Sequence, residues 1–428
     1  MTHETNGPVP EVFSTAQYRN NQLFIEEVNV SELAQAWGTP TYVYSRSAIV
    51  SAYKQFDDPW QDVDHTVCYA VKANSNLSIL RLLGELGAGF DIVSGGELER
   101  VIRACGHASK VVFSGVGKTA SEISAALEAD ILCFNVESAG ELTLIEQIAR
   151  EKNRSARISI RFNPDVDPKT HPYIATGLKN NKFGVNREEA IRLYCLARDS
   201  AHLDVMGIDC HIGSQITEIT PFTQALEKIL DLAAELEEKQ IPIRHIDLGG
   251  GLGVRYKDEP EVDAEVYASA IKQILGRKLS QIHLLFEPGR YLMANAGWLI
   301  TRVLYLKDNG DKHFAIIDAA MNDLLRPALY ESWQAVMPAV IGDSHRTLHN
   351  VDLVGPVCES GDYLAKDRSL SVCPGDLLAI CSAGAYGFSM SSNYNTRVRP
   401  AELLIDGTTI RCIRKRETID ELLRLELQ

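Results

Sequence analysis

Between residues 66 and 289 one pattern occurs eight times, and this repetition limits the possible folds more than any other feature. Each time, a short apolar run rich in β-branched and aromatic residues precedes a longer segment with apolar residues at helical spacing. Strands that are apolar on both faces and alternate with helices are typical of a parallel sheet. The predicted strands cover 66–72, 89–93, 110–115, 131–136, 157–163, 205–213, 245–251 and 282–289.

The number of repeats predicts an α/β fold, a (β/α)8 TIM barrel, which we assign to residues 41–295. Eight units in roughly 225 residues match the usual size of such a barrel. A doubly wound open sheet is the alternative that the pattern leaves open. From 296 to 428 short strand-like runs with few long helices predict an all-β domain, Greek-key or sandwich-like. The N-terminal segment 1–40 is also strand-like, and we expect it to complete that β domain.

Charge and cysteine content exclude several classes of protein. The 428 residues carry a net charge of −14, which argues against the basic surface that nucleic acids or anionic membranes require. Nine cysteines without a CxxC pair are typical of reduced thiols in a cytoplasmic protein. The N-terminus lacks the pattern of a secretory signal, and no apolar run approaches the ~20 residues of a membrane span. We therefore predict a cytoplasmic protein.

Polar side chains stand at nearly every predicted strand exit, where barrels of this kind place their active sites. Generic turn residues would be expected at a rim with a purely structural role. The segment 163–184 has no clear periodicity, and a loop of that length is typical of a lid or substrate loop. The strand-exit residues are Lys72, Asp91, Ser114, Asn135, Arg161, Asn163, His211, Ser214, Gly249–Gly251, Glu287 and Arg290.

Two motifs at the last strand exits indicate an anionic ligand with a ring nitrogen. Three glycines in "DLGGGLGV" follow the seventh strand, the usual position of a phosphate site in this fold. A dinucleotide fingerprint would need glycine at position 254, which is Val254. In "EPGR" the carboxylate of Glu287 can hold a ring nitrogen protonated, and Arg290 can bind phosphate or carboxylate. A salt bridge between these two residues is the structural alternative.

The interpretation of Lys72, in "CYAVKAN", depends on the residues at the other strand exits. A lysine at a strand end is more commonly a solvated flank. Beside a phosphate loop, a carboxylate for a ring nitrogen and a histidine, it instead indicates a pyridoxal 5'-phosphate site with Lys72 as the Schiff-base amine. His345 and His349 have i,i+4 spacing but no third ligand, so we predict no metal site.

These residues resemble the fold type III, alanine-racemase-like family of pyridoxal-phosphate-dependent decarboxylases, and within it the diaminopimelate decarboxylases. The resemblance covers essentially the whole chain, and the order and spacing of its motifs make it specific. The motifs are "YAVKAN", "FDIVSGGELERV", "FSGVGKT", "TGLKNNKFGV", "CHIGSQI", "DLGGGLGV", "EPGRYL", "MNDLLRPALY", "GPVCESGD" and "GAYGFSMSSNYN".

The resemblance implies a role for each cofactor residue. Lys72 binds the cofactor covalently, His211 stacks on its ring, and Glu287 pairs with its pyridine nitrogen. Ser214 and the three glycines hold the phosphate, and Arg290 lies between phosphate and substrate. The implied cofactor-binding set is Lys72, His211, Ser214, Gly249, Gly250, Gly251, Glu287, Pro288, Gly289, Arg290 and Tyr386.

The resemblance also implies a substrate site shared between the subunits of a homodimer. Cys358, the proton donor, and Glu359 would come from the second subunit, and Cys358 joins Lys72 and His211 as catalytic residues. The implied substrate-binding set is Arg290, Arg326, Tyr330, Glu359 and Tyr386.

The implied reaction is decarboxylation of meso-2,6-diaminopimelate to L-lysine and CO2, the last step of lysine biosynthesis. Arg326 with Tyr330 suits a distal carboxylate, and Glu359 suits a distal ammonium. A decarboxylase of ornithine, arginine or lysine, or an amino-acid racemase on the same barrel, is the alternative enzyme. A catalytically inactive homologue that binds a partner protein is the alternative from another class.

Overall fold

The computed structural model describes residues 9–168, 177, 181–342 and 348–427. The middle of the 163–184 segment and His345 therefore lie outside the described residues. The chain divides into two compact units, one of residues 53–254 and 260–291, the other of residues 1–52, 255–259 and 292–428. Every helix in the described part of the chain is too short or too polar to cross a membrane.

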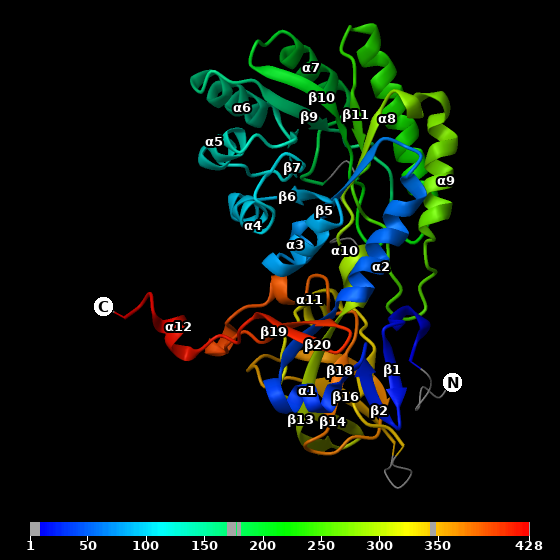
Figure 1. The fold of residues 1–428 in the computed structure, drawn as a ribbon, viewed down its shortest axis with the longest axis vertical. Helices are drawn as coiled ribbons and strands as arrows, with labels where there is room; N and C mark the ends of the chain where they lie inside the picture. Colours follow the sequence, from blue (N-terminus) through cyan, green and yellow to red (C-terminus); the bar gives the residue numbers. More distant parts are fainter. Residues whose placement is uncertain (1–8, 169–176, 178–180, 343–347, 428) are drawn as a thin grey trace. The chain divides into compact units, whose positions relative to one another are not determined.

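The first unit is a closed barrel of parallel strands with the connecting helices outside it (Figure 1). The closure is made by β12 and β5, with Leu284 opposite His65. All eight predicted strands are present, which confirms the barrel and excludes the open sheet. The strands are β5 (His65–Ala70), β6 (Gly89–Ile92), β7 (Val111–Phe113), β8 (Cys133–Val136), β9 (Ala156–Arg161), β10 (Leu203–Asp209), β11 (His245–Asp247) and β12 (His283–Phe286).

Side chains cap the N-termini of most of the barrel helices, and the caps Ser94 and Ser138 lie two residues after the preceding strand. Ser94 and Ser138 each accept a hydrogen bond from the third residue of the helix they precede, and Thr119 forms a capping box with Glu122. These caps fix where each strand ends and each helix starts. The helices are α3 (Leu77–Glu85), α4 (Gly95–Cys105), α5 (Ala120–Glu128), α6 (Ala139–Glu151), α7 (Arg187–Arg198), α8 (Thr220–Glu238), α9 (Ala264–Leu275) and α10 (Arg290–Met293).

The second unit is mostly sheet, as predicted. Its main sheet has nine strands, with β17, β16, β14, β13, β4, β19 and β20 in that order, β18 paired with β13, and β15 paired with β18. The strands are β4 (Thr41–Ser45), β13 (Gly297–Asn309), β14 (Lys312–Ile317), β15 (Val336–Pro338), β16 (His349–Val354), β17 (Tyr363–Leu370), β18 (Leu377–Ile380), β19 (Ala401–Asp406) and β20 (Thr409–Arg414). Two short helices, α11 (Arg326–Tyr330) and α12 (Ile419–Leu423), complete this part.

The N-terminal segment belongs to the β unit, as expected, and contributes a sheet of its own. Its strands β1 (Ala16–Arg19), β2 (Gln22–Ile25) and β3 (Val28–Asn29) form a separate three-stranded sheet, followed by α1 (Val30–Trp37). Leu23 and Ile25 of this sheet pack in one apolar core with Val43 and Trp298 of the main sheet. The next strand, β4, lies inside the range predicted for the barrel, yet it pairs with β13 and β19. The boundary between the units falls within α2 (Arg46–Asp57).

The nine cysteines are all free thiols. Cys68 and Cys133 pack with Val112 and Leu285 in one buried cluster of barrel strand residues. Cys358 is exposed, which distinguishes it from these structural thiols.

Candidate active site

Lys72 lies on a single 3-10 turn, Val71–Ala73, that follows β5 directly. Its Nζ is 2.5 Å from Oδ2 of Asp91, which is fully buried in β6, while the lysine side chain is 38% exposed. A buried carboxylate at this distance holds the amine at the barrel rim and leaves part of the side chain accessible. The structure therefore places the predicted amine beside another of the predicted strand-exit residues.

Glu287 follows β12 directly and is buried. Ser114 Oγ donates to Glu287 Oε1 at 3.3 Å, and Asn135 Nδ2 is 3.3 Å from the same oxygen and 3.1 Å from Ser114 Oγ. Residues from the exits of three strands thus fix the orientation of one carboxylate. This network joins three of the predicted strand-exit residues.

Glu287 is also one of three buried carboxylates that sequence reasoning did not group. A carboxylate oxygen from each of Asp209, Asp247 and Glu287 lies within 4.8 Å of one from the other two. Burial, and repulsion from neighbouring carboxylates, raise the pKa of Glu287 and of Asp209 well above the ordinary carboxyl value. Burial and the charge of Asp91 raise the pKa of Asp247 to about 6. A cationic group next to Glu287 would relieve this repulsion, which a protonated ring nitrogen would do.

The glycine loop after β11 lies so close to neighbouring backbone that side chains are excluded. A Cβ on Gly250 would be 2.2 Å from the carbonyl oxygen of Glu287, and a Cβ on Gly251 would be 2.4 Å from that of Gly213. Gly251 also has a φ of +110°. The three glycines are therefore required here by contact and by conformation.

His211 follows β10 and contacts this loop. The backbone N–H of Gly250 donates to His211 Nδ1 at 3.1 Å, which places the ring proton on Nε2. Burial lowers the pKa of His211 well below its usual value, and the nearby charges of Arg161 and Lys72 lower it further. The imidazole is therefore neutral and held in one tautomer, as a ring-stacking residue would be.

Ser214 and Arg290 form a hydrogen-bonded pair beside the glycine loop. Ser214 Oγ accepts from Arg290 Nε at 3.3 Å and from Nη2 at 3.0 Å. Ser214 adjoins Gly213, whose carbonyl contacts the Gly251 position. A hydroxyl, a guanidinium and close backbone N–H groups suit a phosphate group. Arg290 therefore donates two hydrogen bonds to Ser214, in the position expected of a phosphate-binding arginine.

Arg161 and Glu137 form a second, compensated charge pair at the barrel mouth. Arg161 Nη1 lies 3.1 Å from Glu137 Oε1, and both side chains are buried. Backbone N–H groups of Gly115 and Gly184 donate to the two oxygens of Glu137, each at 3.0 Å. Glu137 was not among the predicted residues, and it differs from Glu287 because a cation and two N–H groups already satisfy it.

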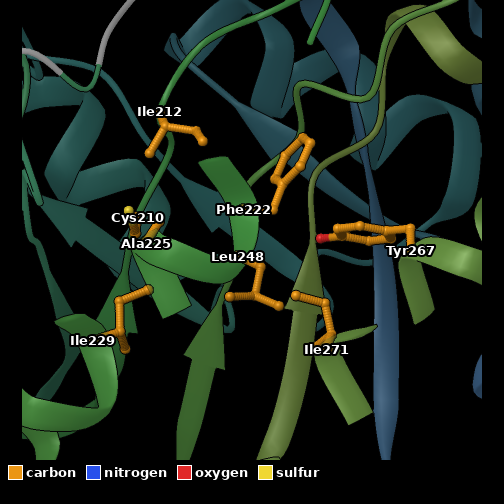
Figure 2. A pocket seen from close by; sticks show the side chains of 8 residues that line it. All are labelled: Cys210, Ile212, Phe222, Ala225, Ile229, Leu248, Tyr267 and Ile271. Carbon is orange, nitrogen blue, oxygen red and sulfur yellow. The ribbon is translucent and has the colours of Figure 1, made fainter. Parts of the chain in front are cut away.

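The apolar packing behind the glycine loop positions the ends of β10 and β11. Figure 2 shows side chains from these strand ends and from α8 and α9 that converge on a cavity of about 10 Å³, room for about one water molecule. Such dense packing holds His211 and the glycine loop in register. The lining residues are Cys210, Ile212, Phe222, Ala225, Ile229, Leu248, Tyr267 and Ile271.

Five of the predicted site residues, Arg326, Tyr330, Cys358, Glu359 and Tyr386, lie in the β unit, while Asn163, Pro288 and Gly289 belong to the barrel unit. Arg326 begins α11 and is buried, and Tyr330 ends the same helix and is partly exposed. Tyr386 follows β18 with a φ of +54°, in the left-handed region that tyrosine rarely adopts. An outlier of this kind is typical of a position where a side chain must point in one specific direction.

Cys358 and Glu359 are exposed in the turn between β16 and β17. The backbone N–H of Cys358 donates to Asn395 Oδ1 at 2.8 Å, and Tyr394 Oη donates to Glu359 Oε2 at 2.9 Å. Asp362 closes the turn by accepting from the backbone N–H of Val357 at 2.8 Å. The turn is thus held in a defined shape and presents a thiol and a carboxylate at the surface of this unit.

Comparisons with known proteins agree with this chemistry. Residues 46–294 match the family model described as "Pyridoxal-dependent decarboxylase, pyridoxal binding domain". The diaminopimelate decarboxylase of Pseudomonas aeruginosa is 56% identical over 409 residues, which are 95% of this chain and 97% of that protein.

Solved structures give the same result. The diaminopimelate decarboxylase of Helicobacter pylori complexed with L-lysine has a TM-score of 0.89 and 45% identity, over 93% of this chain and 99% of that one. The M. jannaschii diaminopimelate decarboxylase in co-complex with L-lysine has a TM-score of 0.92 and 39% identity, over 97% and 98%.

Proposed function

The chain belongs to the pyridoxal-dependent decarboxylases and, within them, to the diaminopimelate decarboxylase family, and on that premise we propose which residues perform the reaction. The reaction releases CO2 from one end of meso-2,6-diaminopimelate and leaves L-lysine. The observation that carries our assignment is the convergence at the barrel mouth of the Lys72 amine, the Glu287 carboxylate and the glycine loop.

The residues of the barrel mouth fit pyridoxal 5'-phosphate. Ser214, Arg290 and the loop Gly249–Gly251 would hold the phosphate, and the absence of room for a Cβ at Gly250 supports a close backbone approach. Pro288 and Gly289 carry the chain from Glu287 to Arg290 along the same rim. When bound, the cofactor supplies an electron sink for the electron pair that remains after CO2 leaves.

Glu287 keeps a proton on the ring nitrogen. Its carboxylate is held by Ser114 and Asn135, and its neighbours Asp209 and Asp247 make an adjacent cation favourable. An ion pair at ~4 Å contributes about 4 kcal/mol at an effective dielectric constant of 20. That corresponds to roughly three pKa units, enough to keep a pyridine nitrogen protonated at neutral pH. His211, which is neutral, covers the ring face without opposing that positive charge.

The β unit supplies the substrate residues. Arg326 and Tyr330 bind the distal carboxylate, and Glu359 binds the distal ammonium. Tyr386 would take part in binding both cofactor and substrate. Cys358 donates a proton to the carbon that lost CO2, for which a thiol is a suitable general acid.

Substrate choice is tested by CO2 release from meso-diaminopimelate, ornithine, lysine and arginine, measured side by side. We expect meso-diaminopimelate to be strongly preferred, because a buried arginine facing a substrate without a distal carboxylate would lose its ionic partner. Preference for another substrate would overturn the substrate assignment. Chiral analysis of the product separates decarboxylation from racemisation.

We further propose a homodimer in which Cys358 and Glu359 act in the partner's active site, which their surface exposure supports. Mixing inactive Lys72→Ala subunits with inactive Cys358→Ala subunits tests this arrangement. Random reassortment of a dimer gives one intact shared site in each mixed dimer, and hence about a quarter of the wild-type activity. No recovery after verified subunit exchange would contradict shared sites. A cytoplasmic location stays a prediction, supported by the nine free thiols.

A further inference from the structure

We propose that Tyr256 and Gln334 are positioning residues for Arg326, and that they set its guanidinium to receive the carboxylate that substrate and product share. The inference deepens the proposed function and rests on it. Sequence patterns did not single out either residue, and all three belong to the same compact unit.

Tyr256 stacks on the guanidinium. Arg326 Cζ lies 4.7 Å from the centroid of the Tyr256 ring, and both residues are buried, each 6% exposed. A desolvated cation over an aromatic face is attracted to it, and the contact fixes the plane of the guanidinium. Tyr256 is itself anchored, because its backbone N–H donates to Glu259 Oε2 at 2.9 Å.

Gln334 fixes the rotation of the guanidinium within that plane. Gln334 is fully buried, and the amide orientation that satisfies both neighbours accepts from Arg326 Nη1 at 3.0 Å and donates to the Cys381 carbonyl at 2.5 Å. Arg368 Nη2 donates to the backbone carbonyl of Gln334 at 2.9 Å. The glutamine is therefore held at its side chain and at its backbone.

The chemistry of the two partners suits a carboxylate-binding arginine. An aromatic face and an amide oxygen orient a guanidinium without adding a negative charge at the contact. Bidentate binding of a carboxylate depends on the plane and the rotation of the fork, the two variables that Tyr256 and Gln334 fix. A glutamate at position 334 would contact the same nitrogen with a full negative charge and would compete with the ligand.

A pair of ligands isolates this effect. Loss of CO2 from one end of diaminopimelate leaves the carboxylate and ammonium of the other end in L-lysine. Cadaverine is the same five-carbon diamine without that carboxylate. The dissociation constants of both ligands, measured by calorimetry on the cofactor-loaded enzyme, therefore separate carboxylate recognition from general binding.

The experiment compares wild type with Tyr256→Phe, Tyr256→Leu, Gln334→Leu, Gln334→Glu and Arg326→Lys. We expect both leucine variants to weaken binding of L-lysine about tenfold, equal to about 1.4 kcal/mol of binding free energy. The dissociation constant of cadaverine should stay within about twofold of the wild-type value. Tyr256→Phe keeps the ring and should bind as wild type does. Gln334→Glu, which is nearly isosteric, should weaken the binding of L-lysine more than Gln334→Leu does.

Equal weakening of both ligands in the leucine variants would assign the two residues a structural role only and overturn the inference. If the leucine variants misfold, Gln334→Glu is the deciding variant. Unchanged selectivity for L-lysine over cadaverine in that variant would also overturn the inference. A failure of the proposed function looks different, because Arg326→Lys would then leave L-lysine binding unchanged or wild type would not bind L-lysine at all.

Discussion

Replacement of Glu287 by glutamine should change stability and activity in opposite directions. In the cofactor-free protein Glu287 shares a buried cluster with Asp209 and Asp247, and burial together with repulsion raises its pKa well above the ordinary value. The ionised carboxylate therefore destabilises this form. Glutamine keeps the oxygen that Ser114 and Asn135 contact and removes the charge. We expect Glu287→Gln to stabilise the cofactor-free protein and to impair the loaded enzyme.

The size of the expected increase in the free energy of unfolding follows from the geometry of the carboxylate cluster. Two unit charges 4.8 Å apart repel by about 3.5 kcal/mol at an effective dielectric constant of 20. The folded protein can avoid the repulsion by taking up a proton instead, which costs about 1.4 kcal/mol for each pH unit above the unfolded-state pKa. The less costly route limits the penalty, so we expect the variant to gain about 1–3 kcal/mol in free energy of unfolding at pH 8.

The sign of the pH dependence is fixed by the raised pKa values. At pH 4 these carboxyls hold protons in the folded state and about half do so in the unfolded state, so the penalty is small. As pH rises through 6, the carboxyls of the unfolded state have lost their protons. The folded cluster either retains its protons or ionises and is destabilised by repulsion, so the free energy of unfolding of the wild type falls. The gain of Glu287→Gln should therefore be near zero at pH 4 and grow towards pH 8.

Glu137→Gln is the matched control, because Glu137 is also a buried glutamate at the barrel mouth but pairs with Arg161 at 3.1 Å. Removal of one partner of a buried pair destabilises by about 3–5 kcal/mol. Denaturant unfolding of the cofactor-free variants from pH 4 to 8 measures both effects. The loaded Glu287→Gln enzyme should lose about a thousandfold in kcat, the equivalent of about 4 kcal/mol. Equal destabilisation by both substitutions at pH 8 would refute the reasoning.

Three further substitutions test the rest of the site. Lys72→Ala should abolish the visible absorption band that the wild type develops with added pyridoxal phosphate; a retained band would exclude Lys72 as the covalent attachment point. Gly250→Ala should weaken cofactor binding at least tenfold, because its Cβ would lie 2.2 Å from backbone that cannot move aside, and an unchanged affinity measured by fluorescence titration would contradict this. Cys358→Ala should slow turnover at least a hundredfold with the band intact, and an unchanged rate would remove its role as an acid.

The barrel could be predicted from the sequence because its strands are buried on both faces. Each strand is then mostly apolar, and eight such runs interrupted by amphipathic helices leave few alternatives. The route of the N-terminal segment could not be predicted in the same way. Strand β4 is as fully buried as a barrel strand, and its sequence does not encode that its partners, β13 and β19, lie more than 250 residues later.

The active-site residues also differ in whether the sequence alone could reveal them. Lys72, Glu287 and the glycines stand out in the sequence because charged residues and a run of three glycines follow apolar strands directly. Asp209 and Asp247 lie in one cluster with Glu287, yet each is the last residue of a strand before a turn, where aspartate is common.

Their importance comes from three-dimensional convergence, which the sequence does not display. Strands β10, β11 and β12 are neighbours in the barrel, so their exits bring Asp209, Asp247 and Glu287 together. Each carboxylate alone would be an ordinary turn residue, while the three together favour a cation beside them. The site therefore depends on how the barrel closes as much as on its sequence motifs. We expect that moving one of these carboxylates by one position along its strand would disable the site as fully as removing its charge.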